Sequence, residues 1–129
     1  MSYYQGFRDL IVYQKSYKLA MEIFEIIKTF PKEEKYSLTD QMRRSSRSVS
    51  SCIAESWAKR LYTKAFVNKL TDSLGEEFET EDWLEYSIDC KYITKEEYQE
   101  VTSEYQEVHK MLVSMINNPE KWCLKNENN

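Results

Sequence analysis

One stretch decides the fold of this chain, Ser37–Lys59, which reads SLTDQMRRSSRSVSSCIAESWAK. At 3.6 residues per turn its apolar and small residues fall on one side of a helix. They form a stripe of Leu38, Met42, Ser45, Val49, Cys52, Ile53 and Trp57. Because the centre of the stripe is small, a neighbouring helix can approach it closely. The stretch therefore predicts a packed helix, with basic residues on its remaining faces.

Three further stretches repeat apolar residues at steps of three and four, which is typical of amphipathic helices. Together the four predicted helices cover residues about 9–30, 37–60, 63–91 and 95–117. Asp9 and Thr63 are candidate caps for the first and third helices, and Pro31 disfavours a helical residue before it. Short connections between four helices favour an all-α, antiparallel up-and-down four-helix bundle.

Two capping boxes are predicted from the spacing of a hydroxyl residue and an acid three positions later. Thr94 and Glu97 match the pattern fully, whereas Ser37 with Asp40 is a weaker match. Gly75 lies inside the third helix at a cost of about 1 kcal/mol relative to Ala, so we expect a bend or a very close neighbour there.

A chain of 129 residues is long enough for one domain with a substantial core. Two glycines and two prolines are too few for a protein made of many turns. We expect a bundle over residues 1–119 and a polar C-terminal tail over 120–129. No signal-peptide pattern or long apolar run is present, which favours a cytoplasmic protein with no membrane contact.

The three cysteines, Cys52, Cys90 and Cys123, lack the paired spacing of a zinc site. We interpret them as free thiols in a reducing compartment, with Cys52 and Cys90 buried by packing.

Charge is distributed unevenly along the chain, although the net charge is only −4. Residues 43–69 carry seven bases and a single acid, Glu55, whereas residues 72–107 carry thirteen acids and two lysines. Two interpretations remain open. The basic block binds an anionic partner, or the two blocks pair with each other within the bundle or between subunits.

If the partner is RNA, six basic residues are the candidate phosphate contacts: Arg43, Arg44, Arg47, Lys59, Arg60 and Lys64. Trp57 and Tyr62 are candidates for stacking on unpaired bases, although a place in the core or in a subunit interface is the favoured role of Trp57.

An enzyme is not indicated. His109 is the sole histidine, and the Glu-x-x-His motif of di-iron bundles is absent because position 106 is Gln. No nucleophile elbow or phosphate-binding glycine loop is present, so we expect no catalytic residue, cofactor or metal. Glu55 is interpreted as an ion-pair partner of Lys59, and His109 as a partly buried structural residue.

From Phe7 to about Ile116 the chain resembles the 23S rRNA intervening-sequence proteins, also called S23 proteins. The motifs that carry the resemblance are Phe7–Lys15, Phe30-Pro31 with Glu34, Leu38–Arg44, Ile53–Glu55, Phe66, Lys69-Leu70, Ser73–Glu76, Glu79, Glu81, Trp83-Leu84 and Tyr92-Ile93. Two departures are present. Cys52 and Ser56 replace the Asn and Gly of a common Asn-Ile-Ala-Glu-Gly motif, and Leu74-Gly75-Glu76 replaces Arg-Gly-Ser.

The resemblance implies a bacterial bundle that assembles into a ring, commonly a homopentamer, and associates with RNA. A related branch resembles the accessory proteins of diversity-generating retroelements, which bind a reverse transcriptase and nucleic acid. Ten Tyr, five Phe and three Trp also favour self-association, because aromatic residues are enriched at interfaces. The alternative function is a protein scaffold whose acidic third and fourth helices bind a basic partner without contacting nucleic acid.

Overall fold

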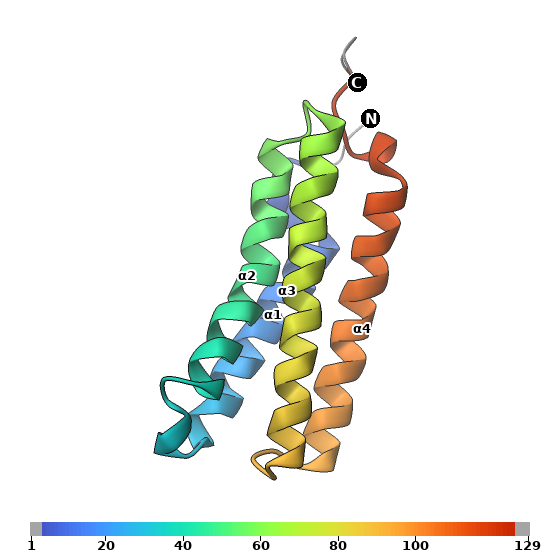
Figure 1. Ribbon diagram of the computed structural model, residues 1–129. Helices are drawn as coiled ribbons and strands as arrows, with labels where there is room; N and C mark the ends of the chain where they lie inside the picture. Colours follow the sequence, from blue (N-terminus) through green and yellow to red (C-terminus); the bar gives the residue numbers. More distant parts are fainter. Residues whose placement is uncertain (1–3, 126–129) are drawn as a thin grey trace.

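The computed structural model describes residues 4–125, and within them it contains four α-helices and no strand. The helices are α1 (Ile11–Ile26), α2 (Leu38–Ala58), α3 (Thr63–Asp89) and α4 (Lys95–Asn117). Successive helices run in opposite directions, so both termini lie at the end of the bundle that carries the α2–α3 turn (Figure 1). Four short 3-10 helices flank them: Phe7–Asp9, Ile27–Thr29, Lys32–Glu34 and Pro119–Lys121. The all-α four-helix architecture predicted from the sequence is confirmed.

The helix ends differ from prediction by a few residues. The first α-helix begins at Ile11 after an extended Leu10, because Phe7–Asp9 forms a separate 3-10 turn. Ser37 precedes α2 without a side-chain cap, and the Glu34 carboxylate accepts the Leu38 N–H instead at 3.3 Å. The box predicted for Ser37 and Asp40 is therefore wrong.

The capping box at the start of α4 is confirmed. The Thr94 hydroxyl accepts the Glu97 N–H at 3.0 Å, and the Glu97 carboxylate accepts the Thr94 N–H at 2.9 Å. Two of the four unpaired N–H groups at this helix start are thus satisfied by side chains. The preceding helix ends two residues earlier than predicted, because Lys91 adopts a left-handed conformation with φ of 64°.

The contact between α2 and α3 is lined with small hydroxyl residues, which we call the hydroxyl seam. Its members are Ser45 of α2 and Ser73, Thr80 and Ser87 of α3, all of them buried. The Ser73 hydroxyl donates to the Val49 carbonyl, and the Thr80 hydroxyl donates to Ser45 Oγ, both at 2.8 Å. The close approach predicted for the small centre of α2 is therefore confirmed.

Three expectations about individual residues are wrong. The apolar repeat of the third helix includes Phe78 and so predicts that it is buried, but Phe78 is 52% exposed, whereas its neighbour Glu77 is fully buried. Cys90 is exposed and does not fill the core. A Cβ added to Gly75 would meet no atom within 4 Å, and α3 continues through this position, so no close neighbour requires the glycine.

The packed part of the chain extends past Pro119. Trp122 and Cys123 contact the hydrophobic core, and the Trp122 ring lies 5.4 Å from the ring of Tyr4. The Leu124 N–H donates to the Arg60 carbonyl at 3.0 Å, which holds the start of the predicted tail against the α2–α3 turn. No helix within residues 4–125 is long and apolar enough to cross a membrane.

Candidate nucleic-acid interface

Three of the six predicted contact residues, Arg43, Arg44 and Arg47, lie together on α2 and are called the arginine group. Arg43 and Arg47 are one helical turn apart on the same side, and Arg44 lies beside them. Arg44 and Arg47 are exposed and Arg43 is half-buried. The arginine group therefore points away from the core, because the core-facing positions between the arginines are occupied by serines.

The arginine group is not neutralised by the acidic block of α3 and α4. Arg44 Nη1 lies 3.7 Å from Asp40 Oδ2 of its own helix, in a solvent-exposed pair. The Arg47 guanidinium lies 5.9 Å from the centroid of the Phe24 ring. Across residues 4–125, neither Arg43 nor Arg47 has a carboxylate within 4.0 Å.

The other three predicted contacts, Lys59, Arg60 and Lys64, form a separate turn group at the α2–α3 connection. At 1.5 Å per residue, Lys59 is about 18 Å from Arg47 along the helix axis. Lys59 and Lys64 are exposed, and neither forms an ion pair with a residue that the structure describes. The six residues thus form two groups and not one continuous patch.

Arg60 has a packing role. Its guanidinium carbon lies 3.6 Å from the centroid of the Trp57 ring, and its Nε donates to the Trp57 carbonyl at 2.8 Å. Burial lowers the pKa of this guanidinium. Trp57 is half-buried against the core and also contacts Tyr4, so its ring is occupied by packing. Tyr62 is exposed, as a stacking residue would have to be.

Glu55 does not pair with Lys59 as expected. Its carboxylate lies 3.1 Å from Lys69 Nζ, which is also 3.5 Å from Asp72. These two carboxylates raise the pKa of Lys69. Glu55 pairs with Lys69 because Lys69 of α3 faces the side of α2 that carries Glu55. Lys59 is left available for an anionic ligand.

A groove between α1 and α2, which we call the aromatic groove, adjoins Arg47 and was not predicted. It has a volume of about 400 Å³ and is lined by Phe7, Tyr13, Tyr17, Ala20, Met21, Arg47, Ser50, Ser51 and Ala54. The Tyr13 and Tyr17 rings are 5.9 Å apart, and Tyr17 is 52% exposed. Tyr13 and Tyr17 belong to the apolar repeat of the first helix, which predicts that both are buried. The four-residue spacing of the two tyrosines places their rings on one side of α1, and this spacing is the part of the groove that the sequence shows.

A second unpredicted feature is the buried Glu77 of α3. Neither of its carboxyl oxygens has a hydrogen-bond partner, and His109 Nδ1 lies 3.4 Å from Glu77 Oε1. Burial and the neighbouring Glu81 raise the pKa of Glu77 to about 9. His109 is half-buried against the Phe78 ring, as its expected structural role implies. Within the described part of the chain, no three His, Cys, Asp or Glu residues are arranged to hold a metal.

Comparison with known proteins agrees with this architecture. The family model described as 23S rRNA-intervening sequence protein matches residues 8–114. The chain belongs to this family. A crystal structure of a protein of unknown function from the S23 ribosomal protein family of Bacteroides thetaiotaomicron superposes with a TM-score of 0.75 at 34% sequence identity. The match covers 82% of this chain and 98% of that one. No curated protein matches the sequence.

The two departures from the family motif keep the packing but change the surface. Ser56 is fully buried, and its hydroxyl donates to the Ile53 carbonyl at 2.6 Å, so it is accommodated within the α2 core face. Cys52 is half-buried, and burial raises the pKa of its thiol. Glu76 adds an acid beside Glu79 and Asp72, and burial together with these neighbours raises its pKa. The basic surface therefore does not continue from α2 onto this part of α3.

Proposed function

We propose that this protein is a non-enzymatic RNA-binding protein that uses the arginine group and the turn group as phosphate contacts. The observation that carries the proposal is the outward position of the three α2 arginines. Two of them have no carboxylate partner in the described chain. Unpaired arginines on a rigid helix bind phosphate without first breaking an internal ion pair. Family membership supports a link to RNA.

The aromatic groove supports single-stranded RNA as the preferred form. A base on the exposed Tyr17 ring would lie beside Arg47, which would contact its phosphate. Stacking on aromatic side chains is the usual way in which proteins hold unpaired bases, and duplex RNA does not offer its bases for stacking. Arg43 and Arg44 would then contact neighbouring phosphates along α2.

Self-association belongs to the same proposal, with a homopentamer favoured by the family resemblance. Several large aromatic side chains are exposed on the single chain, including Tyr36, Tyr62, Phe78 and Tyr86. A ring would repeat the arginine group around its axis and convert weak contacts into stronger overall binding.

The proposal is tested with Arg43→Glu/Arg47→Glu in a binding titration of the purified assembly against a single-stranded RNA at several salt concentrations. We expect at least a tenfold loss of affinity, because two phosphate contacts become repulsive. The matched control is Lys32→Glu/Lys121→Glu, which changes the net charge equally at two exposed lysines with no ion pair in residues 4–125. Equal binding by both double variants and the parent protein would contradict the proposal.

The alternative function is a protein scaffold. The surface expected from the sequence is the acidic side of the third and fourth helices, whereas the groove that favours a scaffold lies between α1 and α4.

A further inference from the structure

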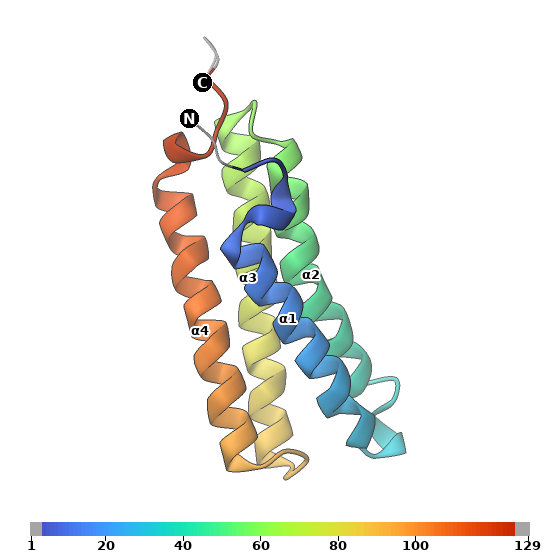
Figure 2. The ribbon, with the colours of Figure 1, turned by 180° about the vertical axis from the view of Figure 1, so that it is seen from behind.

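A groove opens between α1 and α4 on the face opposite the hydroxyl seam. The two helices diverge toward the end that carries the α1–α2 and α3–α4 connections (Figure 2). The groove has a volume of about 490 Å³, within the range of ligand-binding clefts. It is lined by Lys18, Met21, Glu22, Glu25, Ile26, Glu97, Glu100 and Val101.

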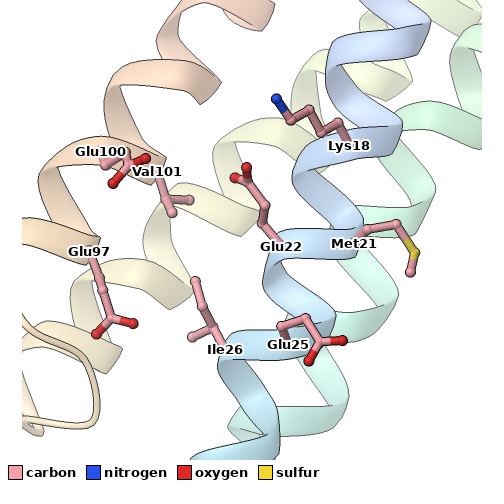
Figure 3. Close-up of a pocket in the computed structure, with 8 residues that line it drawn as sticks. All are labelled: Lys18, Met21, Glu22, Glu25, Ile26, Glu97, Glu100 and Val101. Carbon is pink, nitrogen blue, oxygen red and sulfur yellow. The ribbon is translucent and has the colours of Figure 1, made fainter.

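The floor of this groove is apolar. Ile26 of α1 and Val101 of α4 extend toward each other across the gap (Figure 3). Val101 is buried in the core, whereas Ile26 is half-buried and packs against the core from the groove side. The single chain thus leaves apolar side chains at the base of an open groove between two helices.

The rim of the groove is acidic. In Figure 3 the Glu22 carboxylate reaches from α1 into the gap, and Glu97 and Glu100 lie on the facing turn of α4. Neither Glu22 nor Glu100 has a basic nitrogen within 4.0 Å among residues 4–125. Lys15, one turn before Lys18, is already paired with Glu104 and Glu107. Burial, followed by the charges of Glu104 and Glu100, raises the pKa of Glu22 despite the nearby Lys18.

We propose that the α1–α4 groove binds a cationic amphipathic helix of a partner protein. Its apolar face would cover Ile26 and Val101, and its Lys or Arg residues would pair with Glu22 and Glu100. This is the helix-in-groove mode of recognition, with charge complementarity at the rim. From Lys18 to Ile26 the α1 wall is about 12 Å long, which matches two to three turns of a bound helix.

The chemistry of the groove distinguishes this occupant from others. RNA is repelled by the four carboxylates. A second copy of this chain carries the arginine group, but the exposed face of its α2 offers Gln41, Ser51 and Glu55 on either side of the arginines and no large apolar anchor. A helix that is both basic and apolar satisfies the rim and the floor together. The proposal is independent of RNA binding, since none of the six predicted phosphate contacts lines the groove.

The test uses an 18-residue helical peptide with leucines on one face and lysines on the other. A permuted peptide of the same composition has no apolar face. Fluorescence anisotropy of each labelled peptide is measured at 0.15 M salt against the parent protein, Glu22→Gln/Glu100→Gln and Glu79→Gln/Asp82→Gln. The last variant removes two carboxylates from the outer side of α3 and is the matched control.

We expect the amphipathic peptide to bind at least tenfold more tightly than the permuted one. The groove variant should weaken its binding by about fivefold or more, with the control variant within twofold of the parent. Equal binding of the two peptides, or equal loss in both variants, would overturn the proposal. Light scattering of the protein alone provides a second check. A groove variant that loses its own assembly would assign the groove to a second copy and would also overturn it.

Discussion

At the scale of single residues, the burial of Glu77 is not predicted by the apolar pattern of the sequence. The hydroxyl residues Ser73, Thr80 and Ser87 continue the buried line of α3 on both sides of it. A periodicity count that scores only apolar residues selects Phe78 for the core. The buried position belongs to Glu77, beside the unpaired hydroxyl of Tyr105. Burial raises the pKa of Tyr105, and the Glu77 carboxyl adds to the shift.

Replacing Glu77 should change the pH dependence of stability. Because the pKa of Glu77 is about 9 in the folded protein and near 4.5 when unfolded, the folded state holds the extra proton. Its contribution is therefore fully present below pH 4.5 and declines as the pH rises toward 9. We expect Glu77→Gln to remove this decline and to stabilise the fold at pH 8 by roughly 1 to 3 kcal/mol.

Urea unfolding between pH 4.5 and 9 measures this effect, with Glu79→Gln on the outer side of α3 as the control. A Glu77→Gln variant that follows the parent's pH profile would show that the carboxyl does not titrate in the folded state as described.

Gly75 provides a second test at a single residue. Its position in α3 is exposed, and an added Cβ would contact nothing within 4 Å. Gly75→Ala should therefore raise the free energy of unfolding by about 0.5 to 1 kcal/mol through a lower entropy of the unfolded chain. Thermal unfolding monitored by circular dichroism measures this change in stability. A lower melting temperature would show that the glycine is needed by an assembled state or by a bend in the helix.

At the scale of helices, the apolar period was enough to predict the four elements and the close contact of α2. Their ends were less predictable, because capping depends on which side chain reaches the free N–H groups. Glu34 from the preceding turn caps α2 in place of Ser37, a contact that depends on how the 3-10 turn folds back. The positions of the basic residues along the helices could be predicted from the sequence. The aromatic groove could not, because it depends on where along its length α1 crosses α2.

Because the hydroxyl seam is tightly packed, a larger side chain on α2 should destabilise the protein at a seam position but not on the exposed side of the helix. Ser45→Leu places two additional heavy atoms where Ser45 Oγ accepts the Thr80 hydroxyl, so we expect a loss of about 1 to 3 kcal/mol of stability. Ser51→Leu, on the exposed side of the same helix, should change stability by less than about 0.5 kcal/mol. Chemical denaturation of the two variants and the parent protein measures the change in the free energy of unfolding. Similar small effects would mean that α2 and α3 separate to accommodate the larger side chain.

At the scale of the whole molecule, charge and shape distinguish two faces of the bundle. The α1–α2 side carries the arginine group and the aromatic groove, whereas the α1–α4 side carries the acidic groove. Family resemblance could suggest RNA as a partner from the sequence, but the acidic groove arises from α1 and α4, which are distant in sequence. The acidic groove could therefore be identified only from the arrangement of the helices in the bundle.

The proposed self-association is also tested at the scale of the whole molecule. If the exposed aromatic residues form subunit contacts, light scattering should give a mass near five times the 15.5 kDa of one chain. A mass of 15.5 kDa at micromolar concentration would mean that the aromatic side chains remain exposed and would remove the contribution of multivalency to RNA binding.

The most direct test of RNA binding is to map the contact itself. Ultraviolet cross-linking of the assembled protein to a single-stranded RNA, followed by mass spectrometry of the attached peptides, identifies the residues that contact it. We expect cross-linked nucleotides on segments 13–17 and 43–51, which combine the tyrosines of the aromatic groove with the arginine group. Cross-links confined to α3 and α4, or an absence of cross-links under conditions where the RNA is bound, would contradict RNA binding through the α1–α2 face.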